Sequence, residues 1–166
     1  MNLIDTLRDV GRDTLSEFST INWGGCCVYA AVVAAWLQEH DITTWGLVAD
    51  KKQSPSAVDS ARPKDPLFVS NWNDNGITFF HVMVQFEHEG KVWTHDTEST
   101  IDNELECKAV TQFSNKICPG YLEVAELVSL ASDSHWNSQF DRSLIPSVAK
   151  RVWRNLELGH RKGLAF

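Results

Sequence analysis

The sequence predicts a single α+β domain in which helices pack on an antiparallel sheet. Residues 26–39 (CCVYAAVVAAWLQE) are apolar on nearly every side, which is typical of a helix buried at the centre of a domain. Residues 77–87 (ITFFHVMVQFE) alternate with the period of a strand, and residues 88–90 supply a turn into a second strand over residues 91–97. A chain of 166 residues suits one domain, so we expect residues 1–166 to form one unit.

The other elements follow from local patterns. Residues 3–18 have roughly helical spacing of apolar side chains and predict an amphipathic helix, and residues 43–49 predict a strand. Residues 50–66 hold three prolines and many polar side chains, which indicates a long loop. Residues 120–132 and 140–158 predict two further helices, the second with a proline near its beginning, where proline is tolerated.

Composition argues against two kinds of partner. The net charge of −7 argues against nucleic-acid binding, and the basic residues near the C-terminus suit the solvated face of a terminal helix. No apolar run reaches the length of a membrane span, so we expect no membrane partner. Residues 1–15 carry several charges and form no apolar signal segment. The expectation is a cytoplasmic protein with reduced cysteines.

The segment Asn22–Ala30 (NWGGCCVYA) opens the apolar helix and places a cysteine in its first turn. Gly24 and Gly25 let the backbone turn sharply and approach another group closely. At the start of a helix, the N–H groups without helical partners and the positive end of the dipole favour a thiolate over a thiol. Cys26 is therefore a candidate nucleophile, and its ordinary alternative is an apolar packing residue.

A thiolate nucleophile needs a base, and the base needs a third group that orients it. His81 and Asp96 fit these two roles by strand register. A four-residue hairpin loop over residues 87–90 places His81 opposite Asp96, with Cβ atoms about 5 Å apart. A two-residue turn instead pairs Asp96 with Met83 and leaves it diagonal to His81. Both registers predict that the imidazole and the carboxylate lie near each other.

The equal spacing of His81, His88 and His95 invites a metal-site interpretation. An offset of seven residues, however, places neighbours on opposite faces of a strand, so these side chains are not expected to converge. We therefore expect no metal site, and thiol chemistry needs no organic cofactor.

The two motifs together resemble those of transglutaminase-like proteins, a branch of the papain-like cysteine protease superfamily. Gly24–Ala30 (GGCCVYA) is similar to the G-x-C-x-x-[FY]-A segment of that branch. His81–Phe86 (HVMVQF), followed by Gly90, Trp93 and Asp96, is similar to its H-x-W-x-E … G-W … D segment. The order of cysteine, histidine and aspartate is also that of the family.

The resemblance covers residues 22–97 and implies a central nucleophile helix packed on an antiparallel sheet. It also implies a catalytic triad of Cys26, His81 and Asp96. Three positions depart from the common family pattern: Met83, Gln85 and Thr97. These departures affect the expected substrate class more than the triad.

Cys27 is the alternative nucleophile, because the segment also aligns with ubiquitin-specific proteases (N-x-G-x-x-C) and with ovarian-tumour-type proteases (G-x-C-[LV]-[FY]). Side chains of consecutive helical residues point about 100° apart, so only one cysteine faces His81. We favour Cys26, which fits the transglutaminase-like spacing. Asn22 is the candidate oxyanion donor, together with the backbone N–H of the nucleophile, and Trp23 is expected to line the cleft.

These residues predict a cysteine-dependent acyl-transfer enzyme that acts on a protein or peptide substrate. Hydrolysis, as in a peptidase, deamidase or amidase, is favoured because it is the common activity among papain-like proteins. Transglutamination or another acyl transfer stays open, and a peptidoglycan amidase is a further alternative. A different class of function is a non-catalytic domain that keeps the fold and binds a partner protein in its cleft or on its acidic surface.

Overall fold

The computed structural model describes residues 2–22, 24–50, 79–102, 118–132 and 140–163. The elements follow in the order α1 (Leu3–Glu17), α2 (Cys26–Glu39), β1 (Thr44–Asp50), β2 (Phe79–His88), β3 (Lys91–His95), β4 (Thr100–Ile101), β5 (Cys118–Leu122), α5 (Val124–Ser132), the 3₁₀ turn η1 (Arg142–Leu144) and α6 (Ile145–Gly163). Within these residues the strands form one antiparallel sheet in the order β4-β3-β2-β1-β5. Helices pack on this sheet, so the predicted α+β class is confirmed.

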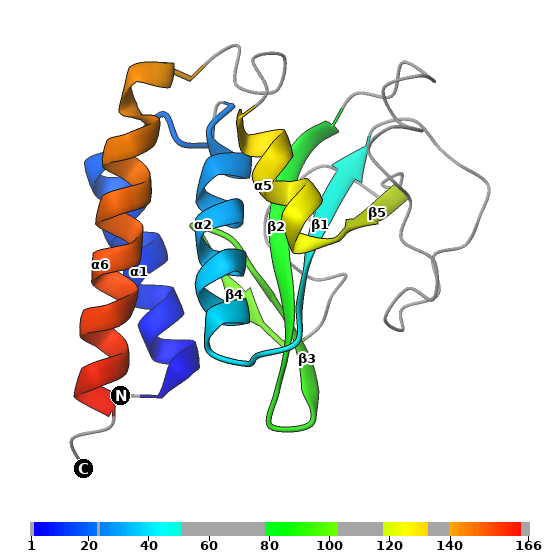
Figure 1. The fold of residues 1–166 in the computed structure, drawn as a ribbon, viewed down its shortest axis with the longest axis vertical. Helices are drawn as coiled ribbons and strands as arrows, with labels where there is room; N and C mark the ends of the chain where they lie inside the picture. The colour runs from blue at the N-terminus through cyan, green and yellow to red at the C-terminus, as the bar shows by residue number, and fades with distance from the viewer. Residues whose placement is uncertain (1, 23, 51–78, 103–117, 133–139, 164–166) are drawn as a thin grey trace.

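Helix α2 lies at the centre of the domain, between the sheet and the pair formed by α1 and α6 (Figure 1). Nine of its 14 residues are buried, and Ala34, Trp36 and Leu37 have no exposed surface. Val82 and Phe86 of β2 belong to the same core. A helix that packs against the sheet, α5 and α6 needs apolar side chains at most positions, which explains the uniform sequence of this segment.

Gly24 and Gly25 precede helix α2 and allow the chain to turn and pack closely just before Cys26. Gly24 has a φ of 111°, a backbone angle that residues with a Cβ atom rarely adopt. A Cβ on Gly25 would lie 2.8 Å from a ring carbon of Phe140 and 2.9 Å from the Cδ1 atom of Ile21. The first glycine is thus needed for its backbone angle and the second for space, and together they fix where the cysteine stands.

The β2–β3 hairpin closes with a two-residue turn. Glu89 and Gly90 have φ values of 53° and 74°, and His88 pairs with Lys91. Positive φ at both turn positions matches the right-handed twist of the flanking strands, which favours this short connection. The four-residue loop, and with it the direct pairing of His81 with Asp96, is therefore wrong; the alternative register is the one adopted.

One predicted helix is partly wrong. The segment expected to be helical over residues 120–132 starts as strand β5, and the helix begins only at Val124. Leu122 pairs with Gly46 of β1 and has no exposed surface. Pairing with an edge of the sheet satisfies backbone groups that the local apolar pattern alone assigned to a helix.

The strand expected over residues 91–97 ends two residues early, at His95. Asp96 begins a four-residue loop that leads into β4, since His95 pairs with Thr100. The backbone N–H of Asp96 donates to the carbonyl of Ser99 across this loop, at 3.0 Å. We call residues 91–101 the β3–β4 hairpin.

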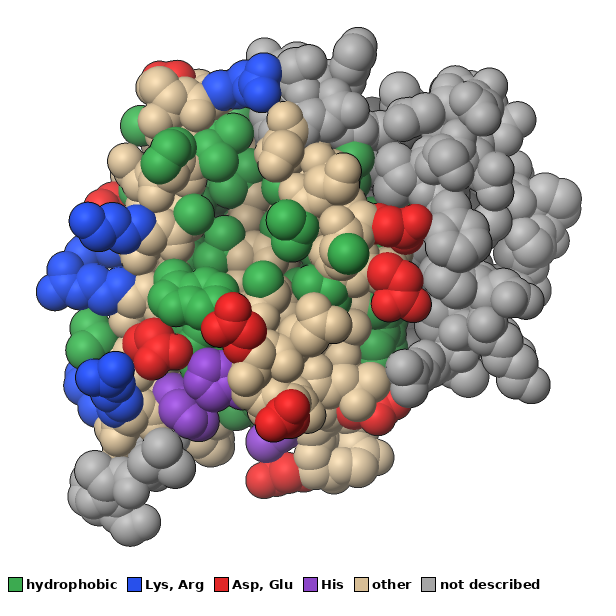
Figure 2. All heavy atoms as spheres, viewed as in Figure 1, with side chains coloured by type: hydrophobic (Ala, Val, Ile, Leu, Met, Phe, Trp, Pro, Cys, Tyr) green, Lys and Arg blue, Asp and Glu red, His purple; other side chains and the backbone are tan. Residues whose placement is uncertain are grey.

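The C-terminal helix, expected over residues 140–158, begins at Ile145 and extends to Gly163. Its lysine and arginine side chains are exposed and lie along the α6 edge in Figure 2, which confirms the predicted solvated face. Apolar side chains gather beside them where α2, α5 and α6 enclose a groove of about 420 Å³. The predicted loop over residues 50–66 lies outside the described residues, apart from Asp50. Among the described helices, none has the length and apolar character needed to cross a membrane.

Helix α1 supports the loop of the β3–β4 hairpin by close backbone contact. A Cβ on Gly11 would lie 3.0 Å from the carbonyl oxygen of Thr97 and 3.2 Å from that of Asp96. The Arg8 guanidinium donates to the carbonyl of Thr100 at 3.1 Å. The absence of a side chain at position 11 is therefore what allows the helix to approach the residues around Asp96.

We expect Gly11→Ala to lower the free energy of unfolding by about 1 kcal/mol, because a Cβ must displace backbone oxygens. In an uncrowded helix the same change would be stabilising by up to about 1 kcal/mol. Ser16→Ala, at an exposed position of the same helix, is the matched control and should be neutral or slightly stabilising. Urea unfolding measures both, and a Gly11→Ala protein more stable than wild type would contradict the crowding.

Candidate active site

Cys26 and His81 meet where the start of α2 lies against β2. Cys26 is the first residue of α2 and is half-buried, whereas His81 on β2 is only 5% exposed. The His81 side chain lowers the pKa of the Cys26 thiol, and the backbone groups of Val82 and Cys27 lower it further. A half-buried cysteine thus lies beside a buried imidazole.

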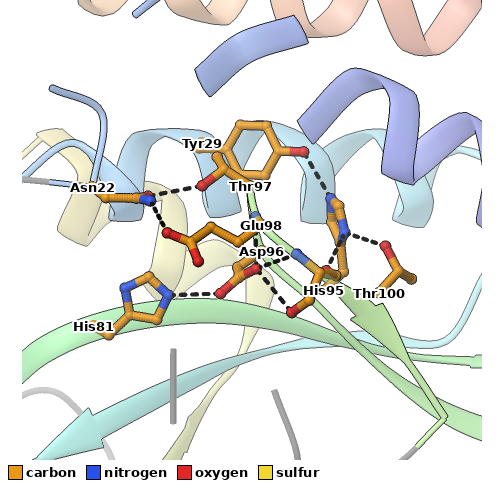
Figure 3. A network of polar contacts seen from close by, with 9 residues as sticks. Asn22, Tyr29, His81, His95, Asp96, Thr97, Glu98 and Thr100 are labelled. Atoms are coloured by element: carbon orange, nitrogen blue, oxygen red, sulfur yellow. Dashed lines mark hydrogen bonds and ion pairs between the residues drawn. The ribbon is translucent and has the colours of Figure 1, made fainter. Parts of the chain in front are cut away.

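Asp96 contacts the imidazole of His81 (Figure 3). The Nε2 atom of His81 lies 3.1 Å from the Oδ2 atom of Asp96, and both side chains are buried. Since Nε2 is used by the carboxylate, Nδ1 is the ring nitrogen left for the sulfur of Cys26. The diagonal register therefore still brings the predicted imidazole and carboxylate into direct contact.

The second oxygen of Asp96 is held by the loop that follows it. Its Oδ1 atom accepts from the backbone N–H of Glu98 at 2.9 Å, from the N–H of Ser99 at 2.8 Å and from the Ser99 hydroxyl at 3.1 Å. Three donors on one oxygen favour the carboxylate form and fix its orientation. The other oxygen is thereby aimed at His81.

Burial and hydrogen bonding compete at the Cys26–His81 pair. Burial raises the pKa of Cys26, but the hydrogen bond and the charge of His81 outweigh it, so the thiol pKa lies below its ordinary 9.0. Burial alone would lower the pKa of His81, while the bonds to Asp96 and Cys26 raise it from 6.5 to about 10. Relative to the isolated side chains, the arrangement therefore favours the thiolate form of Cys26 and the imidazolium form of His81.

Cys27 occupies a different environment from Cys26. It is 2% exposed, belongs to the hydrophobic core, and directs its sulfur toward the carbonyl oxygen of Gly24 at 3.9 Å. Cys26 is a free thiol, and it is the cysteine whose pKa His81 lowers.

Asn22 reaches the loop after Asp96 rather than the thiol. Its Oδ1 atom accepts from the Thr97 hydroxyl at 2.8 Å, and its Nδ2 atom lies 3.4 Å from the carboxylate of Glu98. In Figure 3 its side chain lies on the same side of the loop as Glu98. The predicted oxyanion role of Asn22 remains a prediction, and Trp23 lies outside the described residues.

A cavity of about 530 Å³ lies between α1 and the β3–β4 hairpin. Its walls include Arg8, Arg12 and Asp96 but neither Cys26 nor His81. It therefore borders the loop that carries Asp96 but neither the thiol nor the imidazole, and we do not assign it to a substrate of Cys26.

Tyr29 and His95 form a second buried contact that sequence patterns did not single out. The Tyr29 hydroxyl lies 2.7 Å from the Nε2 atom of His95, and the Nδ1 atom of His95 lies 2.8 Å from the Oγ1 atom of Thr100 and 3.1 Å from the carbonyl of Ser99 (Figure 3). The available signal was a tyrosine one turn after Cys26 on an otherwise apolar helix, because a buried hydroxyl requires a partner. Burial lowers the pKa of His95 from 6.5 to about 4.

Among the described residues, no three histidine, cysteine, aspartate or glutamate side chains gather in a way that would hold a metal ion. The chain matches no protein-family model, and no curated protein and no solved structure shows a significant match to it. The resemblance to transglutaminase-like proteins therefore rests on the motifs of this sequence alone and stays a prediction.

His95 should make stability depend on pH between its two pKa values. Its folded pKa of about 4 lies below the ordinary 6.5, so its contribution is complete above pH 6.5 and is lost as the pH falls toward 4. The expected loss between pH 6.5 and 4.5 is about 2 kcal/mol. Urea unfolding of wild type and His95→Gln at pH 6.5 and 4.5 isolates this effect. Equal pH dependence in the two proteins would show that His95 is not held neutral.

Proposed function

We propose that this chain is a cysteine hydrolase of the papain-like superfamily, transglutaminase-like branch, that cleaves amide or ester bonds in a protein or peptide substrate. One observation carries the proposal. A half-buried cysteine at the start of the central helix has its thiol pKa lowered by a buried imidazole, and that imidazole lies 3.1 Å from a buried carboxylate. Strongly shifted pKa values of this kind cluster at functional sites.

The geometry supports the two steps of thiol hydrolysis. The Cys26 thiolate attacks the carbonyl carbon, and the C–N or C–O bond breaks as the imidazolium of His81 gives its proton to the leaving amine or alcohol. A thioester remains on the sulfur. His81, now neutral, takes a proton from water, the water oxygen attacks the thioester, and the carboxylic acid leaves as the sulfur is released.

Asp96 stabilises the imidazolium form of His81 and fixes the direction in which its ring points. The developing oxyanion needs donors near the sulfur, and backbone N–H groups in the first turn of α2 are suited to this role. Asn22 is the proposed side-chain donor, which requires its amide to turn from Glu98 toward the substrate. Water is the proposed acceptor. With an amine as acceptor, the same thioester would give acyl transfer instead.

A binding module without catalysis would not need this charge arrangement. A buried ion pair contributes little stability compared with apolar residues of similar volume. The placement of this pair beside a cysteine whose thiol pKa it lowers thus favours chemistry over packing.

We expect iodoacetamide to alkylate Cys26 rapidly at pH 6, where a thiol of ordinary pKa 9.0 is about one-thousandth ionised. Cys26→Ala should abolish the fast labelling, and Cys27→Ala should retain it because Cys27 is buried in the core. Peptide mapping of the labelled protein identifies the site. Slow labelling of wild type, with no preference for Cys26, would favour the binding module.

Asp96→Asn should raise the pH midpoint of Cys26 alkylation by about one unit or more, because the amide no longer supports the imidazolium. The variant keeps an oxygen that can accept from the Ser99 N–H, so the loop should stay formed. Glu98→Gln removes a charge from the same loop without touching His81 and is the matched control. An unchanged midpoint in Asp96→Asn would remove Asp96 from the triad.

A further inference from the structure

Two paths of side-chain interactions connect α2 to the β3–β4 hairpin. The first runs from Cys26 through His81 to Asp96. The second runs from Tyr29 to His95, three residues after Cys26 and one residue before Asp96. Because one helical turn spans about 3.6 residues, both paths start from the same turn of α2.

Ser99 joins the two paths at their other end. Its carbonyl accepts from His95 at 3.1 Å, and its N–H and hydroxyl donate to the Oδ1 atom of Asp96. The contacts therefore form a closed ring, which Figure 3 shows from His81 round to Tyr29. The helical backbone between Tyr29 and Cys26 completes it. A shift of one residue in this ring of contacts is therefore expected to move the residue it contacts.

The proton positions along the second path follow from its partners. A carbonyl oxygen only accepts, so the Nδ1 atom of His95 must carry the proton that faces Ser99. In the neutral ring Nε2 is then an acceptor, and the Tyr29 hydroxyl must donate to it. The Thr100 hydroxyl oxygen also lies within reach of the Nδ1 proton.

We propose that Tyr29 and His95 are positioning residues for the Cys26–His81–Asp96 triad, in that their hydrogen bond holds Ser99 and thereby fixes the carboxylate of Asp96. This inference rests on the proposed function. Neither residue touches the sulfur or the substrate; they act through the loop that carries Asp96. Removal of the Tyr29 hydroxyl frees the His95 ring, loosens Ser99 and weakens the support that Asp96 gives to the imidazolium of His81.

The second path keeps its proton arrangement over the pH range in which the triad works. The pKa of His95 is about 4, mainly because of burial, and burial together with the charge of Asp96 raises that of Tyr29 well above 10. Asp96 and Tyr29 are the titratable groups that face His95 within the described residues. Between these limits neither group of the second path changes charge.

Tyr29→Phe tests the proposal by removing one hydroxyl from a buried side chain. We expect the pH midpoint of Cys26 alkylation by iodoacetamide to rise by about one unit. Thr94→Val is the matched control, because it removes one buried hydroxyl that accepts from Gln85 at 3.0 Å and lies beside His95 on β3. Both variants should lose stability in urea, but the control should keep the wild-type midpoint.

Two substitutions of His95 provide a second readout. Gln places an acceptor where Nε2 stood and keeps a partner for Tyr29, whereas Asn places a donor near the Nδ1 position and leaves Tyr29 without one. His95→Gln should therefore retain the alkylation midpoint better than His95→Asn. Circular dichroism reports whether each variant is folded.

Each outcome bears on one proposal or on both. A raised midpoint in Tyr29→Phe with an unchanged one in Thr94→Val supports the positioning role. A reactive wild type with equal midpoints in both variants overturns the positioning role and leaves the proposed hydrolase intact. A wild-type Cys26 that reacts at pH 6 no faster than an ordinary thiol overturns the hydrolase and the positioning role together.

Discussion

The contact between His81 and its two partners is the interaction on which the site depends. Burial of the ring by itself would keep the imidazole neutral, and burial of the sulfur would keep the thiol protonated. Each charge becomes favourable only because the opposite charge lies beside it and Asp96 supports the cation. The site is therefore a coupled unit: the thiolate at Cys26 and the imidazolium at His81 are stable together.

Turns and close packing hold the elements that carry Cys26, His81 and Asp96 in place. Gly24 and Gly25 set the first residue of α2, the central helix, whose apolar surface fixes it against the sheet. The tight turn at Glu89-Gly90 sets the β2–β3 register, and the Asp96 loop is closed by its own backbone bonds. The close approach of α1 at Gly11 then limits how far that loop can move.

Much of the site could be predicted from the sequence, because the patterns that indicate it lie within short segments of the chain. The glycine pair, the helix-start cysteine and the alternation around His81 each depend on neighbours in the chain. The register of the β2–β3 hairpin was harder, since it depends on whether Glu89 adopts a positive φ, which Glu rarely does. The position of Asp96 was nevertheless predicted, because both registers leave it beside His81.

Residues further from these motifs were not predictable in the same way. The Tyr29–His95 contact joins positions 66 residues apart, and it forms because two elements fold together. Strand β5 was mistaken for a helix because its pairing with β1 involves residues about 75 positions earlier, a distance over which local propensity carries no information.

By itself the sequence determined the central helix, the β2–β3 hairpin and the histidine and aspartate of the candidate triad, since periodicity and turn chemistry act within a few residues. Only the tertiary structure decided which cysteine meets the imidazole and what holds the carboxylate. Cys26 and Cys27 differ by one step along the same helix, and the packing of α2 against β2 and the core turns one sulfur toward His81 and buries the other. That rotation is set by the sum of contacts around the helix, which no local pattern records.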